Sequence, residues 1–244
     1  MDKMIYTVAQ GANRILMSQS MRANNLANAE TVGFKADLER VTAKPIETNT
    51  DSFPSRVMPE IDSNGFSHQH GQMNQTGRSL DAAINGNGMF AVVGPDGKES
   101  YTRNGAFVVD ALGELTVNGM KVVGDGGPIV IPANDNLLIA KNGMVTATTN
   151  NGGVTENIGR LKLVNPDLNN ITKGADGLFH SITDAPLAED ENVEVESGVL
   201  EESNVSAIGE LLACMDLSRQ FEIQIKLMKK ADEMAQAGNR LLNA

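Results

Sequence analysis

Two histidines, His68 and His70, are separated by one residue, a spacing that could serve metal binding. In an extended segment both rings would point to the same side, as two ligands of one zinc ion must. A zinc site needs further ligands, but no cysteine lies nearby and the third histidine, His180, is far away in the sequence. We therefore expect two exposed loop histidines and no metal site.

The other candidates for chemistry are also incomplete. The glycine-rich stretches NGNG (85–88) and GDGGP (124–128) lack the Lys-Ser/Thr pair and the following helix of a phosphate-binding loop. The single cysteine, Cys214, has no histidine at a neighbouring helical spacing. Glycoside hydrolysis needs two carboxylates, one to donate a proton and one to act as base or nucleophile. The acidic residues between 189 and 202 show no sign of such a pair. We expect no catalytic residues and no cofactor.

The composition narrows the class of protein. A formal net charge of −11 over 244 residues argues against nucleic acid as a partner, because phosphate binding needs a basic surface. The single cysteine excludes an internal disulfide framework. No apolar run approaches the length of a membrane span, and the first residues lack the apolar core of a cleaved secretory signal. With 41% hydrophobic residues, the chain can form a folded core.

The first segment of the chain shows helical periodicity. Between residues 4 and 29, apolar side chains recur every three or four residues, which predicts an amphipathic helix. Gly33 and Pro45 follow and end the pattern. The positions that we assign to an assembly interface along this helix are Ile5, Val8, Ala12 and Ile15.

A second and longer helix is predicted from Val205 to the end of the sequence, with Ser203 or Asn204 as its cap. A helix of roughly 40 residues extends about 60 Å. That length exceeds most helices of globular proteins and indicates a coiled-coil partner. The interface positions that we assign to this helix are Leu217, Phe221, Ile225 and Met228.

The middle of the chain is rich in short strands. Residues 34–76 are polar and contain three prolines, which predicts an extended linker with one or two strands. From Leu80 onwards, β-prone runs such as MFAVV (89–93), IVIP (129–132) and MVTATT (144–149) alternate with turns of Gly, Asn and Asp. This pattern predicts an antiparallel sheet or a small barrel-like domain.

The expected organisation has four parts. They are an N-terminal helix and turn (1–33), an extended linker (34–76), a β-rich domain (77–202) and a C-terminal helix (203–244). Both helices are one-sided, and such helices are marginal alone in water. The simplest arrangement pairs the two helices as a coiled coil, and contacts with other subunits would bury the apolar surface that remains.

Four passages of the sequence stand out together. They are ANNLANAETVGFKAD (23–37), GRSLDAAINGNGMFAV (77–92), YTRNGAFVVDALGELTVNGMKVVG (101–124) and the segment 196–241, which begins ESGVLEESNV. In this order they resemble the signatures of flagellar rod, hook and hook-associated proteins. The short length, the start MDKMIYT and the stretch SRQFEIQIKLMKKADE (218–233) are most similar to the proximal rod members of that family.

This resemblance implies a structural protein of the bacterial flagellar basal body and no enzyme. Copies would stack helically with one another and with other rod proteins, forming a homo-oligomeric rod that crosses the periplasm and carries motor torque. The resemblance also implies export by the flagellar type III apparatus without a cleaved signal peptide. No direct membrane span, nucleic acid, metal or cofactor is expected.

Asn24, Asn25 and Asn28 crowd the end of the first helix, although asparagine is a mediocre helix former. One interpretation is an assembly interface, in which short amides bond to a neighbouring subunit, Leu26 and Phe34 provide apolar anchors and Gly33 provides the turn. The other is an ordinary helix end with Asn28 as its cap. The residues alone leave both open, and the family resemblance favours assembly.

Two alternative functions remain at this point. One is another axial protein of the same family, a distal rod or hook protein. The other is a β-rich carbohydrate-binding module with helical oligomerisation arms, which the absence of tryptophan and the presence of only two tyrosines disfavour.

Overall fold

A computed structural model describes residues 2–45, 57–131, 136–148, 155–167, 170–183 and 185–242. In this part of the chain the fold is mainly β, with one helix toward each end of the sequence.

The chain divides into two compact units. The helical unit comprises Met1–Ala29, Asp37–Gly65 and Val205–Ala244, and the β unit comprises Glu30–Ala36 and Phe66–Asn204. The polypeptide therefore passes between the units four times.

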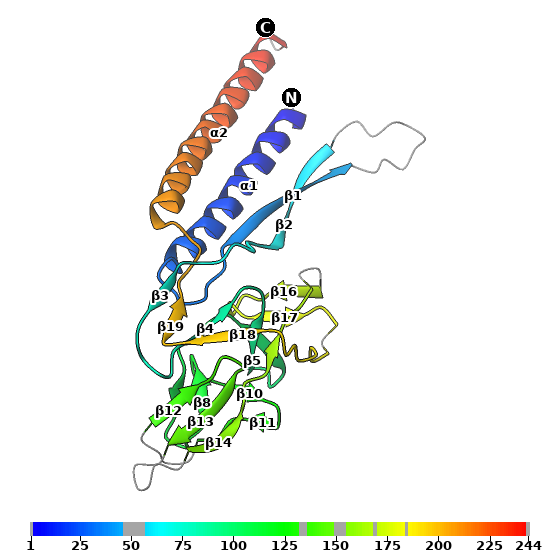
Figure 1. The fold of residues 1–244 in the computed structure, drawn as a ribbon. Helices are drawn as coiled ribbons and strands as arrows, with labels where there is room; N and C mark the ends of the chain where they lie inside the picture. The colour runs from blue at the N-terminus through cyan, green and yellow to red at the C-terminus, as the bar shows by residue number, and fades with distance from the viewer. Residues whose placement is uncertain are drawn as a thin grey trace. The chain divides into compact units, whose positions relative to one another are not determined.

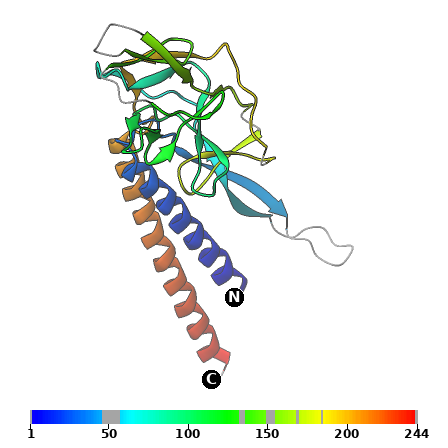
Figure 2. The same cartoon turned by 90° about the horizontal axis from the view of Figure 1, so that it is seen from below.

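Two helices dominate the helical unit. Helix α1 spans Asp2–Ala27 and helix α2 spans Ala207–Leu242. They lie side by side and run antiparallel, as both views show (Figures 1 and 2). Strands β1 (Asp37–Pro45) and β2 (Val57–Phe66) pair with each other in a two-stranded sheet. They lie within the stretch 34–76, for which the sequence predicted one or two strands.

Helix α2 begins one turn later than its predicted caps. The hydroxyl of Ser206 accepts a hydrogen bond from the Gly209 amide at 3.3 Å, which is the geometry of an N-cap. The prediction of Ser203 or Asn204 as the cap is therefore wrong. The side chain of Asn204 is used elsewhere, because it accepts from the Ala36 amide at 2.8 Å and donates to the Gln69 carbonyl at 2.8 Å.

The β unit consists of small antiparallel sheets. The largest has the order β15-β5-β6-β17-β16, and none of the sheets in the described residues closes into a barrel. Its strands are Leu163–Val164, Met89–Val93, Glu99–Thr102, Phe179–Ser181 and Ile171–Lys173.

Two further sheets have three strands each. One is β7-β8-β9, with bounds Val108–Val109, Leu115–Val117 and Met120–Lys121, and the other is β12-β13-β14, with bounds Asn136–Ile139, Met144–Thr148 and Thr155–Arg160. Three strand pairs complete the unit: β10 (Val123–Gly124) with β11 (Gly127–Pro128), β18 (Glu194–Ser197) with β4 (Ala82–Asn85), and β19 (Val199–Glu201) with β3 (Met73–Gln75).

One hydrophobic core holds most of these sheets together. Phe90 and Phe107 are fully buried in it and meet edge to face with ring centroids 5.2 Å apart. A second, smaller cluster contains Phe66, Tyr101 and Phe179. The Tyr101 hydroxyl donates to Glu99 at 2.8 Å and accepts from the Leu187 amide at 2.7 Å, and burial strongly raises the pKa of this tyrosine.

One stretch differs from its predicted structure. In the run IVIP, residues 129–131 form no regular strand; Val130 makes an isolated bridge to Glu114, while Ile129 and Ile131 are buried in the core, and Pro132 lies outside the described residues. The acidic stretch before α2 contains the strand β18, in which Val195 is buried between exposed acids. One face of this strand is buried while its acidic side chains stay in solvent.

Three crossing points of the chain are joined by hydrogen bonds inside the β unit. The Ser67 amide donates to the Ala36 carbonyl at 2.7 Å, and the Asn204 amide donates to the Phe34 carbonyl at 3.3 Å. Together with the Asn204 side chain, these bonds tie residues 34–36, 67–69 and 204 into one junction.

Candidate functional site

Helix α1 buries one face, and three of the predicted interface residues lie on it. Val8, Ala12 and Ile15 are buried at spacings of four and three residues, and Ser18 continues the same face. The side chain of Ile5 lies outside the described residues.

The predicted interface residues on α2 are half-buried and face α1. Glu210 and Ser218 define that side, because Arg22 forms an ion pair with Glu210 at 2.9 Å and Gln19 donates to Ser218 at 3.2 Å. At 100° per residue, the same sector of the helix carries the four predicted positions Leu217, Phe221, Ile225 and Met228. The structure therefore brings the predicted residues of both helices together inside one helical unit.

The opposite face of α2 exposes large apolar side chains among charged ones. The apolar side chains have exposed fractions from 41% to 75%, and they were not among the predicted interface residues. They are Ile208, Leu212, Met215, Ile223, Leu227 and Met234, and we call them the outer stripe. Exposed charged side chains, among them Arg219 and Lys230, separate the stripe into short apolar groups. The spacings of four and three residues from Ile208 to Met215, and of four from Ile223 to Leu227, are the sequence signal that could have identified it.

The three asparagines at the end of α1 have different surroundings. Asn25 is fully buried, and its amide donates to the Asp37 carbonyl at 3.0 Å and accepts from the Asp37 amide at 2.8 Å. Asn28 donates to the backbone and side-chain oxygens of Asn24 at 3.0 and 2.8 Å. Asn25 therefore pins the start of β1 to α1 within the same chain, an intramolecular role that the sequence prediction did not foresee. Leu26 is half-buried in the same turn.

Gly33 and Phe34 are buried in the β unit. Gly33 has a φ of +70°, and a Cβ at this position would lie 2.4 Å from the Asn104 amide nitrogen. Only glycine suits both the left-handed backbone and the close approach. The ammonium of Lys173 lies 3.7 Å above the Phe34 ring, which is a cation–π contact.

A buried charge cluster next to these residues was missed by the sequence prediction. The Glu201 side chain is 1% exposed and accepts from the Lys35 ammonium at 2.6 Å, from Arg103 Nε at 2.7 Å and from the Gly71 amide at 2.9 Å. Arg103 also donates to the carbonyls of Gly86 and Gly88, both at 2.8 Å. The three charged residues are far apart in the sequence, so no local motif announces the cluster.

The cluster shifts the pKa values of its members. Burial alone would raise the pKa of Glu201, but Arg103, Lys35 and the Gly71 amide together hold it below its usual value. Burial lowers the pKa of Lys35 in spite of its carboxylate partner. The pKa of His70 is lowered by burial and then by the charges of Lys35 and Arg103. These directions indicate a positive potential around His70.

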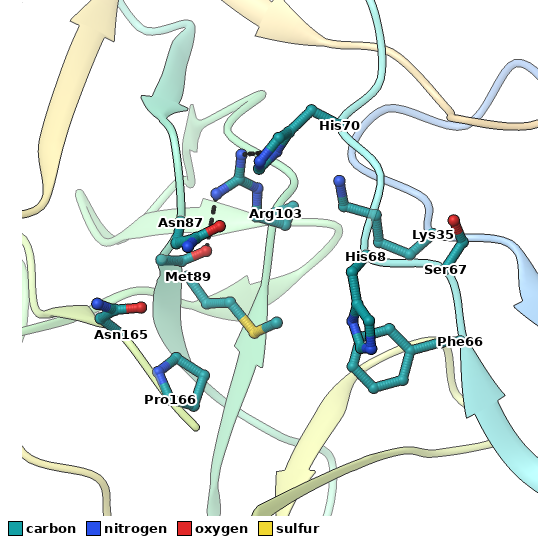
Figure 3. A pocket seen from close by; sticks show the side chains of 11 residues that line it. Lys35, Phe66, Ser67, His68, His70, Asn87, Met89, Arg103, Asn165 and Pro166 are labelled. Carbon is teal, nitrogen blue, oxygen red and sulfur yellow. Dashed lines mark hydrogen bonds between the residues drawn. The ribbon is translucent and has the colours of Figure 1, made fainter. Parts of the chain in front are cut away.

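The cluster forms one wall of a pocket in the β unit (Figure 3). Arg103 and His70 meet at one side, and the His68 ring packs edge-on against Phe66 with centroids 4.7 Å apart. Met89 and Pro166 add apolar surface, and Asn87 and Asn165 add amides. The two sequence-predicted loop histidines are both exposed, and no group of three metal-binding side chains occurs among the described residues.

No helix in the described part of the chain is long and apolar enough to cross a membrane.

Comparison with known proteins places the chain in a family. Residues 83–147 match the model of the flagellar hook protein FlgE/F/G D1 domain, and residues 196–241 match the model of the flagellar basal body rod FlgEFG protein C-terminal region. The second match covers most of α2 with its outer stripe, and the first covers much of the β core. The chain belongs to the family of flagellar basal-body rod proteins and serves as a structural rod subunit.

Within this family, the similarity to proteins named FlgF extends over the whole chain. The flagellar basal-body rod protein FlgF of Escherichia coli is 38% identical, with 100% of this chain and 99% of the relative covered. The flagellar basal-body rod protein FlgF of Salmonella typhimurium is 37% identical, again with 100% of this chain and 99% of the relative covered. The flagellar basal-body rod protein FlgG of Buchnera aphidicola from Acyrthosiphon pisum is 30% identical, with 92% and 94% covered. The sequence-based assignment to a rod protein most like FlgF is thus confirmed.

Proposed function

We propose that this rod subunit polymerises helically through its two terminal helices, which pair as a coiled coil and are completed by neighbouring subunits. The observation that carries the proposal is the outer stripe of α2. The inner side of α2 already packs against α1, so the stripe is free to take a second helix. Heterologous contacts of this kind build an open helical filament.

Burial of the outer stripe against a neighbouring subunit would favour assembly. Complete burial of one large apolar side chain is worth roughly 1.5–3 kcal/mol. The stripe side chains are about half exposed, so each would contribute about 1 kcal/mol on contact with a neighbour. Repetition of the same contact along a polymer offsets the ordering cost that each subunit incurs.

The proposed division of labour follows the order of the sequence. Residues 1–33 and 203–244 would form the assembly core, and residues 77–202 would form a spacer between neighbouring subunits. Residues 34–76 would connect the two. In this arrangement the predicted residues Val8, Ala12 and Ile15 hold α1 against α2, and the outer stripe makes the contact between subunits.

The setting is the basal body of the flagellum, and we place this subunit in the proximal part of the rod, where it would carry torque across the periplasm. Its partners would be further copies and other rod proteins. A single free cysteine suits export in an unfolded state through the flagellar type III apparatus, because no disulfide has to form or break on the way. The role is structural, and no catalytic activity is proposed.

The test replaces two stripe residues by charge. Leu212→Glu and Ile223→Glu together should leave the melting of the purified chain unchanged, since both side chains are exposed. A charge buried at each contact should lower incorporation into isolated basal bodies at least tenfold per site, since tenfold corresponds to about 1.4 kcal/mol. Leu138→Glu, at an exposed position on β12 in the β unit, is the matched control and should incorporate normally. Full incorporation of the double variant would refute the proposal.

A further inference from the structure

The buried charge cluster has more positive than negative charge. Lys35 and Arg103 are cationic and almost completely buried, and Glu201 is the carboxylate that both contact. Among the described residues, no second carboxylate lies within 4.0 Å of either cation. One positive charge is therefore left without a partner beside the pocket, and an uncompensated buried charge is costly. A negative group in the pocket would relieve that cost.

Hydrogen bonding assigns the proton of His70. Its Nδ1 lies 3.3 Å from the Arg103 guanidinium, which can only donate, and 3.8 Å from Glu201, which is too far for a hydrogen bond. Nδ1 is therefore the acceptor, and in the neutral ring Nε2 carries the proton. The His70 side chain is 43% exposed, so this donor is open to an incoming group.

The remaining donors line the pocket on both sides of Arg103. Lys35 has three N–H groups and contacts two acceptors, Gln69 and Glu201. The Asn87 side chain is exposed, and Figure 3 shows it near the Arg103 side. Arg103 itself is saturated, and Asn165 on the other wall already donates to Asp190 at 3.3 Å. The free donors are thus an ammonium, an imidazole and an amide, a set suited to a carboxylate.

We propose that this pocket receives the carboxylate of an aspartate or glutamate from a second copy of this chain. The chain has 31 acids against 20 lysines and arginines, so a positive pocket is the exception on a negative molecule. Exposed acids are available on the β unit, among them Glu194 and Glu196 on β18. The inference rests on the proposed assembly of rod subunits and adds a polar contact to it. Such a contact favours one register between copies over others.

Chemical cross-linking tests the occupant directly. His70→Lys places an amine at the pocket mouth, and a zero-length carbodiimide condenses an amine with a carboxylate in contact, with loss of water. In basal bodies isolated from cells that carry only this variant, we expect covalent dimers of the chain in which residue 70 is joined to an Asp or Glu. Asn142→Lys, on the exposed turn between β12 and β13, is the matched control and should give no such dimer.

Charge and donor variants give a second readout. His70→Glu should lower incorporation into basal bodies roughly tenfold, which corresponds to about 1.4 kcal/mol, because a carboxylate replaces the donor. His70→Gln keeps an N–H donor and should retain incorporation within about twofold. Normal incorporation of His70→Glu, absence of residue-70 dimers in assembled rods, or cross-links only to a different rod protein would each overturn the proposal. Absence of the wild-type chain from basal bodies would instead refute the proposed function.

Discussion

Removal of the negative charge of Glu201 should destabilise the β unit strongly. The side chain is 1% exposed, while those of Lys35 and Arg103 are 6% and 2% exposed, so Glu201→Gln leaves two buried cations facing a neutral amide. Loss of one partner from a buried ion pair typically costs about 3–5 kcal/mol. Here one carboxylate serves two cations and the Gly71 amide, so we expect the upper half of that range, about 4–5 kcal/mol.

Urea and thermal unfolding of the full chain measure this loss. For a protein of this size, each kcal/mol corresponds to roughly 2–4 °C, so the melting temperature of the β unit should fall by about 8–20 °C. Glu202→Gln is the matched control, because Glu202 lies next to Glu201 in the sequence but is exposed, and its carboxylate accepts from the exposed side chain of Asn74 at 3.0 Å. A loss below about 1 kcal/mol for Glu201→Gln, or an equal loss for the control, would show that the buried Lys35 and Arg103 do not depend on the charge of Glu201.

The remaining predictions concern the α1 end, the turn and pH. Asn25→Ala should cost about 1–3 kcal/mol by leaving a buried amide and carbonyl unpaired, and amide exchange at the start of β1 should accelerate; equal exchange in Asn25→Ala and Asn24→Ala would contradict this. Gly33→Ala should destabilise the chain by more than Gly77→Ala, because both have a positive φ near 70° but only Gly33 lies against backbone; equal melting temperatures would remove the steric argument. The pKa of His70 is lowered in the fold, so the unfolded chain binds its proton more readily and stability should decline as the pH falls from 7 through the unfolded value near 6.5. Urea melts of His70→Gln should show a flatter slope over that range, and an unchanged slope would assign the effect to other groups.

Local patterns in the sequence were enough to predict both helices and many strands. The spacing of Val8, Ala12 and Ile15 predicts α1, and MFAVV coincides with β5 because apolar, β-branched residues there are bounded by glycine turns. IVIP has the same local character, but of its described residues 129–131 only Val130 makes a β-bridge, to Glu114. Strand pairing is a tertiary property, so β-propensity alone overstates it.

The parts that escaped prediction depend on distant residues. Lys35, Arg103 and Glu201 come from three separated segments, and only the fold brings them within hydrogen-bond distance. The role of Asn25 was missed for a related reason, because its partner Asp37 belongs to the next element along the chain. The outer stripe is different: its periodicity is visible in the sequence, but which face α1 occupies is decided by the packing of the two helices.

The junction of residues 34–36, 67–69 and 204 has a mechanical consequence. Four hydrogen bonds of 2.7–3.3 Å tie these three segments to one another, so a pull on one segment is shared with the other two. The sheet β12-β13-β14 contributes none of these hydrogen bonds. Changes of length in the turn between β12 and β13, residues 140–143, are therefore expected to leave the junction intact and to be tolerated among subunits that carry the same load.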